Sequence, residues 1–288
     1  MNKISIRFYK DHKVRAVWDE EHNQWWFSVL DVLGAINEQD DHEKNRNYWK
    51  YLKAKLKKEQ NELVSVTTQL KLTAADGKKY NTDVISQAGV EQLAKAIPNS
   101  QAMAFLDWFK YSENTIDGQS RKKAYTLWES NIIADKDVGL QQIHAYLFGG
   151  LYDFAGKIRT KTIAKGGTLF CLAEYLRQNL KTIEQMPETT FDEIVDKYVE
   201  MNVAHPFMEG NGRSTRIWLD MIFKKRIKMC VDWSKINKKD YLNAMVESLK
   251  DSGKIKSLLR QAMTDRIDDR EIFMKGIDYS YYYEQQED

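Results

Sequence analysis

The sequence predicts a chain of two domains, in which a smaller α+β domain precedes a mainly α-helical domain that contains a β-hairpin. Short runs rich in β-branched and aromatic residues dominate residues 1–112, whereas helical periodicity dominates from Arg121 onward. The 288 residues are enough for two separate hydrophobic cores. We therefore place the domains at 1–112 and 113–288, with the boundary in a polar, turn-prone stretch at 111–120.

Composition limits what can be inferred about partners and compartment. The 44 basic and 42 acidic residues nearly cancel, so net charge identifies no partner. Two cysteines far apart in the sequence, Cys171 and Cys230, fit a reducing compartment better than a disulfide framework. The N-terminus lacks a signal-peptide core, and no apolar run reaches membrane-spanning length. The sequence thus predicts a soluble cytoplasmic protein without a membrane partner, and it leaves oligomeric state and export without a cleavable signal open.

The first domain combines strand and helix patterns. Strand-like segments lie at 4–9, at 13–19 and at the start of 24–36, which continues with helix-like spacing. Helical spacing recurs over Asn45–Gln60, and over Gly89–Phe109, where Pro98 divides it into two short helices. Residues 63–86 resemble a hairpin, with Asp76-Gly77 as the turn signal.

The second domain reads as helices around one hairpin. Its exception to helical periodicity is 156–170, where β-branched residues and Gly166-Gly167 predict an irregular hairpin. Thr190 and Glu193 form a capping box that opens a helix. This helix must end near His205-Pro206, because the residue before a proline disfavours the α region. A second amphipathic helix is predicted to begin after Gly212.

Residues 205–216, HPFMEGNGRSTR, lie between these two helices and carry the residue types of a phosphate site. Free N–H groups at a helix N-terminus bind anions, and glycines let the backbone approach phosphate oxygens closely. Arg213 and Arg216 are unfavourable in a first helical turn unless an anion is bound there. Glu209 is suited to a divalent cation, and His205 to removing a proton from a hydroxyl that attacks phosphorus.

This segment resembles the signature HxFx(D/E)GNGRxxR of the Fic family. Every specified position matches, namely His205, Phe207, Glu209, Gly210, Asn211, Gly212, Arg213 and Arg216. Residues 143–159 resemble the family segment before the flap, and 163–170 resemble the flap that aligns the target. The resemblance covers roughly residues 115–285 and implies a mainly α Fic-fold domain with a β-hairpin flap.

The resemblance implies a protein adenylyltransferase, which moves AMP from ATP to a Ser, Thr or Tyr hydroxyl of a target protein. It assigns the hydroxyl proton to His205, Mg²⁺ to Glu209 and a loop anchor in the core to Phe207. It assigns binding of the ATP phosphates to Gly210, Asn211, Gly212, Arg213 and Arg216. The target-positioning flap residues are Ile163, Lys165, Gly166 and Gly167.

Gly212 also bears on which group is transferred. Kinase-like relatives have a lysine at this position, so the glycine favours AMP transfer. Transfer of phosphocholine or of another phosphate-containing group stays an open alternative.

The end of the chain resembles the inhibitory helix of the same family, whose pattern is (S/T)xxxE(G/N). Ser280 and Glu284 are four residues apart and share a helical face, although Gln285 stands where Gly or Asn is usual. The resemblance implies that Glu284 pairs with Arg216 and thereby misplaces ATP.

Local signals place this inhibitory helix at about 277–285. Gly276 is predicted to end the preceding helix and Asp278 to cap the new one. Four tyrosines among residues 279–283 favour a packed segment over a frayed terminus. Tyr281, Tyr282 and Tyr283 are also candidate sites of self-modification that would release the helix.

Residues 25–37 and 84–109 resemble the BRO-N domain of phage antirepressors and DNA-damage-inducible proteins, a family associated with DNA binding. Glu43–Lys58 holds seven basic residues and one acidic residue, and candidate DNA contacts are Lys50, Lys53 and Lys57. The alternatives are a solvated lysine face or a module that selects the target protein.

Two function classes therefore remain. One is an autoinhibited AMP transferase, and the other is a DNA-associated regulator in which the Fic domain is accessory. Among the other histidines, His144 is expected to pack inside a helix rather than to act as a ligand.

Overall fold

The computed structural model describes residues 4–74, 76–130, 139–165 and 167–285. The chain divides into two compact units, one ending at Thr115 and the other comprising Ile116–Gln285. Within the described ranges, no helix is both long and apolar enough to cross a membrane.

The first unit is built on a five-stranded antiparallel sheet with the strand order β1-β2-β3-β5-β4. The strands β1 to β5 cover Ile4–Tyr9, His12–Asp19, Gln24–Ser28, Thr68–Thr73 and Lys79–Ser86. The helices α1 to α5 cover Val29–Ile36, His42–Lys58, Glu62–Ser65, Gln87–Ala96 and Gln101–Tyr111.

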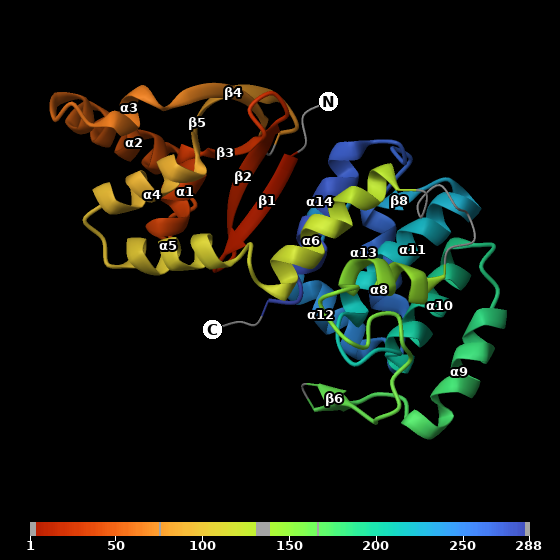
Figure 1. The fold of residues 1–288 in the computed structure, drawn as a ribbon. Helices are drawn as coiled ribbons and strands as arrows, with labels where there is room; N and C mark the ends of the chain where they lie inside the picture. The colour runs from red at the N-terminus through yellow and green to blue at the C-terminus, as the bar shows by residue number, and fades with distance from the viewer. Residues whose placement is uncertain (1–3, 75, 131–138, 166, 286–288) are drawn as a thin grey trace. The chain divides into compact units, whose positions relative to one another are not determined.

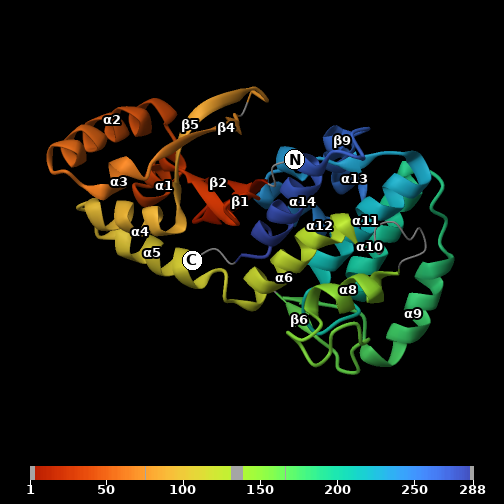
Figure 2. The same ribbon diagram turned by 45° about the horizontal axis from the view of Figure 1, so that its top comes forward.

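Helices α1, α4 and α5 gather on one side of this sheet, as Figures 1 and 2 show. Because successive side chains of a strand point to opposite faces, Ala16 and Ile85 face these helices, whereas Val17 and Val84 pack on the other side. The helix-facing core is completed by aromatic side chains such as Phe105. The predicted α+β character of this unit is confirmed.

The predicted hairpin in this unit is shorter than its sequence pattern. Glu62–Ser65 forms the short helix α3 instead of a strand, because the Asn61 side chain accepts a hydrogen bond from the Leu63 N–H and caps the helix. The turn follows as expected at Asp76-Gly77, where Gly77 has a φ of 79°.

The second unit is mainly helical. Its helices α6, α8, α9, α10, α11, α12, α13 and α14 cover Ile116–Thr126, Leu140–Phe148, Ala173–Gln185, Phe191–Ala204, Asn211–Ile227, Lys238–Glu247, Gly253–Ala262 and Arg270–Tyr282. Short 3₁₀ helices η1 and η2 cover Leu127–Glu129 and Trp233–Lys235. The strand pairs β6–β7 and β8–β9 cover Ala164–Lys165, Thr168–Leu169, Cys230–Val231 and Met263–Thr264.

Helix α11 contacts α8, α10 and α14, and these helices enclose it in the views of Figures 1 and 2. The predicted capping box of Thr190 and Glu193 is present at the start of α10, which ends at Ala204, directly before His205-Pro206. Helix α11 begins at Asn211, so Gly212 lies inside the first turn rather than before it.

The helix predicted at about 277–285 is the last part of a longer helix, α14, which ends at Tyr282, so Glu284 lies just beyond the helix rather than inside it. Helix α14 begins at Arg270, because the Asp269 carboxylate accepts hydrogen bonds from two N–H groups of the first turn. Gly276 lies inside α14 instead of ending a helix, and a Cβ there would lie 3.2 Å from the ring of Trp233. Asp278 is buried and accepts a hydrogen bond from Tyr125 rather than capping a helix.

Candidate active site

The loop between α10 and α11 is held in a defined shape by its own polar groups. The side chain of Asn211 bonds the N–H and the carbonyl of Phe207, each at 2.8 Å, and the Phe207 ring is fully buried. Gly210 has a φ of 80°, and a Cβ there would lie 2.5 Å from the Phe148 ring. Only glycine satisfies both conditions, since a positive φ and a missing side chain are needed together.

His205 caps α10 in the left-handed region, with a φ of 48°. Its Nδ1 lies 3.1 Å from the carbonyl oxygen of Asn202, which can only accept a hydrogen bond. Nδ1 therefore carries the proton, and Nε2 keeps a lone pair. Phe170 stacks on the ring at 3.7 Å between centroids, and burial lowers the pKa of His205 to about 4. The imidazole is thus neutral and ready to accept a proton at neutral pH.

A buried arginine that the sequence did not single out holds this histidine in place. Arg159 donates hydrogen bonds to the carbonyl oxygens of His205 at 2.7 Å and of Ala204 at 3.0 Å. The same guanidinium bonds the carbonyls of Lys161 at 2.6 Å and Cys171 at 2.5 Å, which flank the β6–β7 hairpin. Arg159 therefore ties both ends of the hairpin to the backbone of His205.

Arg213 is 3 % exposed and is surrounded by acceptors at the start of α11. It pairs with Glu209 at 2.9 Å and also with Asp117, which α6 supplies. In the described part of the chain, its Nε has no hydrogen-bond partner. A buried donor without a partner is costly, so this arginine has capacity for a further acceptor.

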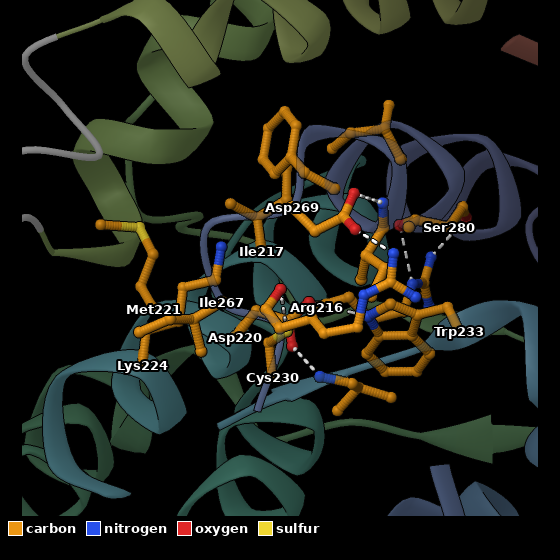
Figure 3. Close-up of a pocket in the computed structure, with 16 residues that line it drawn as sticks. Arg216, Ile217, Asp220, Met221, Lys224, Cys230, Trp233, Ile267, Asp269 and Ser280 are labelled. Atoms are coloured by element: carbon orange, nitrogen blue, oxygen red, sulfur yellow. Dashed lines mark hydrogen bonds and ion pairs between the residues drawn. The ribbon is translucent and has the colours of Figure 1, made fainter. Parts of the chain in front are cut away.

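Arg216 is 2 % exposed and donates to three residues, as Figure 3 shows in part. Its guanidinium meets the Glu284 carboxylate at 2.7 Å, the Ser280 hydroxyl at 2.8 Å and the Tyr241 hydroxyl at 3.2 Å. Burial alone would raise the pKa of Glu284, but the charge of Arg216 and its hydrogen bond outweigh burial and bring the pKa to about 2. The two side chains form a largely buried ion pair between α11 and the residues that directly follow α14.

The carboxylate of Glu284 also occupies the N-terminal end of α11. A Cβ on Gly212 would lie 2.1 Å from Glu284 Oε1, so only a glycine leaves room for this carboxylate. An anion at this place is favoured by the helix dipole and the first-turn N–H groups. The Glu284 carboxylate therefore fills the space beside Gly212 in the first turn of α11.

The strands β6 and β7 form the predicted hairpin beside the loop. Gly167 has a φ of 80° in its turn, and Gly166 lies outside the described residues. Lys165 Nζ lies 3.5 Å from Glu284 Oε2, and the carbonyl of Ile163 accepts a hydrogen bond from Phe170. The hairpin thus adjoins both the His205 ring and the end of α14.

The three candidate tyrosines for self-modification are part of the packed end of α14. The Tyr281 hydroxyl donates to Ser120 at 2.9 Å, and the Tyr283 hydroxyl lies near two backbone carbonyls at 2.9 and 3.0 Å. Tyr282 is half-buried. Modification of Tyr281 or Tyr283 would require this end of the helix to leave its place.

The basic helix α2 of the first unit presents its predicted contact residues unequally. Lys50 and Lys57 are exposed, whereas Lys53 Nζ binds the Asp83 carboxylate at 2.8 Å. Asp83 also accepts a hydrogen bond from the Trp49 indole, so Lys53 belongs to a structural network.

Comparisons with known families agree with the two units. Residues 137–223 match the Fic/DOC family, and residues 13–115 match the N-terminal domain of the BRO family. Each unit of the chain thus matches a different family model, the BRO N-terminal domain in the first unit and Fic/DOC in the second.

Individual relatives match only in part. A probable protein adenylyltransferase, y4lH of Sinorhizobium fredii, is 30 % identical over 37 % of this chain and 61 % of its own length. Protein adenylyltransferase VbhT of Bartonella schoenbuchensis is 26 % identical over 50 % of this chain and 32 % of its own length. The chain therefore spans less than two thirds of either relative.

Among solved structures, BepC from Bartonella tribocorum with bound AMPPNP is 20 % identical. It covers 55 % of this chain and 89 % of its own, with a TM-score of 0.45.

Proposed function

We propose that the second unit is a protein adenylyltransferase, which transfers AMP from ATP to a Ser, Thr or Tyr hydroxyl of a target protein. The observation that carries the proposal is the junction at residues 205–216. A neutral histidine, a carboxylate, first-turn N–H groups and two buried arginines converge there on the start of α11. The matched relatives named as protein adenylyltransferases support the same activity.

In the proposed reaction, Nε2 of His205 accepts the proton of the target hydroxyl as its oxygen attacks the α-phosphorus of ATP. The new bond joins this oxygen to phosphorus, the bond to the β-phosphate breaks, and pyrophosphate leaves. Two features support this role. The Nδ1–H of His205 is engaged by Asn202, and Arg159 and Phe170 fix the position of the ring. Catalysis at phosphorus is mostly positioning and charge stabilisation.

The phosphates are assigned to the start of α11. We infer that the N–H groups of Gly210, Asn211 and Gly212 bind phosphate oxygens together with Arg213, and that Arg216 takes the γ-phosphate. The unpartnered Nε of Arg213 supports this assignment, because it provides a buried donor for an anionic ligand. Glu284 would have to leave Arg216 before that happens.

Glu209 is the residue that we propose for Mg²⁺. Its carboxylate is 48 % exposed and now pairs with Arg213. Within the described ranges, no group of three or more His, Cys, Asp or Glu side chains forms a metal cage, which fits a cation shared with substrate phosphates. When bound, Mg²⁺ neutralises the charge that develops as pyrophosphate leaves.

We further propose that α14 inhibits the transfer. The buried pair of Glu284 with Arg216 supports this proposal, because the guanidinium cannot serve a carboxylate and a γ-phosphate in the same place. Ser280 supports it too, since its hydroxyl and carbonyl both accept hydrogen bonds from Arg216.

The hairpin is assigned to the target. We propose that Ile163, Lys165, Gly166 and Gly167 align the acceptor segment, and the proximity of the hairpin to His205 supports this.

Self-modification of Tyr281, Tyr282 or Tyr283 is a further proposal. Mass spectrometry of the protein after incubation with ATP and Mg²⁺ tests it, and the absence of any adduct on the C-terminal peptide would count against it.

The experiment compares full-length Glu284→Gly with Glu284→Gly/His205→Ala in cell lysate, using ATP labelled at the α- or the γ-phosphate. We expect the α-label on a target protein with the first variant, and its loss with the second. Transfer of the γ-label would point to a kinase, and no α-label on any protein would contradict AMP transfer. A phosphocholine donor tested in parallel covers the remaining alternative.

A second candidate function belongs to the first unit, which we propose contacts DNA through α2. Arg46, Lys50 and Lys57 are exposed, and their spacing places them within about 40° of each other around the helix, over about 16 Å of its length. A row of cations on one helical face suits a phosphate backbone. The proposed contact set thus keeps Lys50 and Lys57, adds Arg46, and treats Lys53 as mainly structural.

A further inference from the structure

A fully buried histidine of α8, His144, bridges two backbone segments of the candidate active site. The N–H of Gly156 donates a hydrogen bond to Nδ1 at 2.9 Å, and Nε2 lies 2.8 Å from the carbonyl oxygen of Glu209. Because Nδ1 accepts and a carbonyl oxygen can only accept, the ring is neutral and carries its proton on Nε2. His144 therefore donates to the backbone of Glu209.

The ring has little freedom to leave this position. It stacks on Phe207 at 3.8 Å between centroids and packs against Phe148 at 4.7 Å. The same two phenylalanines shape the loop, because Phe207 is its buried anchor and Phe148 fills the space beside Gly210. The ring of His144 is thus packed among the side chains that support the loop.

The carbonyl of Glu209 belongs to the same peptide group as the N–H of Gly210. No peptide bond among the described residues is cis, and in a trans peptide the C=O and N–H point in opposite directions. A carbonyl held by His144 therefore turns the Gly210 N–H away from α8. That N–H meets a carboxylate oxygen, Oε1 of Glu209, at 2.9 Å.

Glycine makes this peptide group easy to rotate, since Gly210 lacks the side chain that restricts other residues. The hydrogen bond from His144 to the Glu209 carbonyl therefore favours one orientation of this peptide group. We propose that His144 is a positioning residue, which aims the Gly210 N–H at the phosphate that is transferred. This inference rests on the proposed function, and it gives His144 a role that packing alone does not require.

Two substitutions separate the two hydrogen bonds of the ring. The carbonyl of an asparagine reaches the place of Nδ1, so His144→Asn keeps an acceptor for Gly156 and loses the donor to Glu209. The amide of a glutamine reaches the place of Nε2, so His144→Gln keeps that donor and loses the acceptor. Tyr146→Phe, on the same helix, loses a hydrogen bond to Thr126 and serves as the matched control.

The variants are made in the full-length chain that carries Glu284→Gly. We measure kcat and KM for ATP, the melting temperature, and the ¹⁵N–¹H resonance of Gly210 with and without a non-hydrolysable ATP analogue. We expect His144→Asn to lower kcat at least about tenfold relative to the parent protein, as expected for a misplaced anion-hole donor. The kcat of His144→Asn should also be at least about tenfold lower than that of His144→Gln. The analogue should shift the Gly210 resonance in His144→Gln and in the control, and much less in His144→Asn.

Equal kcat values for the two His144 variants, or losses that only follow their melting temperatures, would overturn the inference and leave a packing role. A Gly210 resonance that responds alike in both would do the same. If the parent Glu284→Gly protein transfers no AMP, the proposed function itself fails, and the resonance still reports whether His144 orients this N–H.

Discussion

The proposed control of the site depends on one side chain, that of Arg216. A buried guanidinium needs an anionic or strongly polar partner, because an unpaired buried charge is costly. Glu284 supplies that partner from just beyond the end of α14, and Ser280 and Tyr241 complete the hydrogen bonds of the guanidinium. A γ-phosphate would satisfy the same donors. In the proposed mechanism, the carboxylate and the γ-phosphate therefore compete for the same guanidinium.

We expect Glu284→Gly to raise AMP transfer by about tenfold or more, in line with coupling energies of about 1–3 kcal/mol. The reason is that Arg216 loses its resident carboxylate and becomes available to ATP. Initial rates with labelled ATP measure the effect. Glu271→Gln is the matched control. It removes a carboxylate of α14 that, among the ion pairs described, pairs only with Lys275. An unchanged rate in a Glu284→Gly protein that still binds ATP would contradict inhibition.

The pH dependence of transfer should reflect the lowered pKa of His205. A base works in its neutral form, and a pKa of about 4 keeps His205 neutral throughout the range from pH 8 to 5.5. An ordinary histidine would instead be half protonated near its usual pKa of about 6.5. We therefore expect kcat/KM of Glu284→Gly to show no acidic limb near pH 6.5. An acidic limb at that pH, without a matching fall in the melting temperature, would show that His205 titrates normally.

At the scale of elements, local signals predict the boundaries that local chemistry decides. The capping box of Thr190 and Glu193 and the proline after His205 lie in the sequence, and both ends of α10 follow from them. The start of α14 is missed although its cap, Asp269, is also local, because Gly276 is interpreted as a helix end. The structure instead places Gly276 inside α14, where a Cβ would lie 3.2 Å from the ring of Trp233.

Asp220 provides an element-scale test of how α11 is joined to its neighbours. Its carboxylate accepts hydrogen bonds from the N–H of Val231 at 2.9 Å and the indole of Trp233 at 2.8 Å, as seen in Figure 3. Burial raises its pKa to about 6, despite these two bonds. Its folded pKa therefore exceeds the value of about 3.9 of an unfolded chain.

A carboxyl with a raised folded pKa contributes stability that is complete below about pH 3.9 and is lost as the pH rises through 6. An asparagine cannot ionise. We expect Asp220→Asn to gain free energy of unfolding relative to the wild type between pH 4.5 and 7.5, by on the order of 2 kcal/mol. Urea unfolding at both pH values measures this difference. A difference that is the same at both would mean that Asp220 titrates normally.

At the scale of the whole molecule, the order of an α+β unit and a helical unit could be predicted because strand and helix patterns change along the chain. The clustering of the motif residues around the start of α11 could be predicted as well, since they are contiguous in the sequence. The residues that support them could not. Arg159, His144 and Asp117 lie 46 or more positions from the motif residues that they bond, which are His205, Glu209 and Arg213, respectively. The spacing of residues along the chain does not reveal these contacts.

The two proposed activities reside in different units of the chain and should be separable by substitution. Lys50→Ala/Lys57→Ala removes two exposed cations, so it should weaken DNA binding and lower the slope of log K against log salt by about 1.8. In the Glu284→Gly protein, AMP transfer should persist when these two substitutions are added, whereas adding His205→Ala should abolish transfer and retain DNA affinity. Lys53→Ala is the matched control, since the charge of Lys53 already pairs with Asp83. This substitution should lower the melting temperature and leave the salt slope nearly unchanged. Unchanged binding by the double variant would leave α2 as a solvated lysine face, and loss of both activities in either variant would show that they depend on each other.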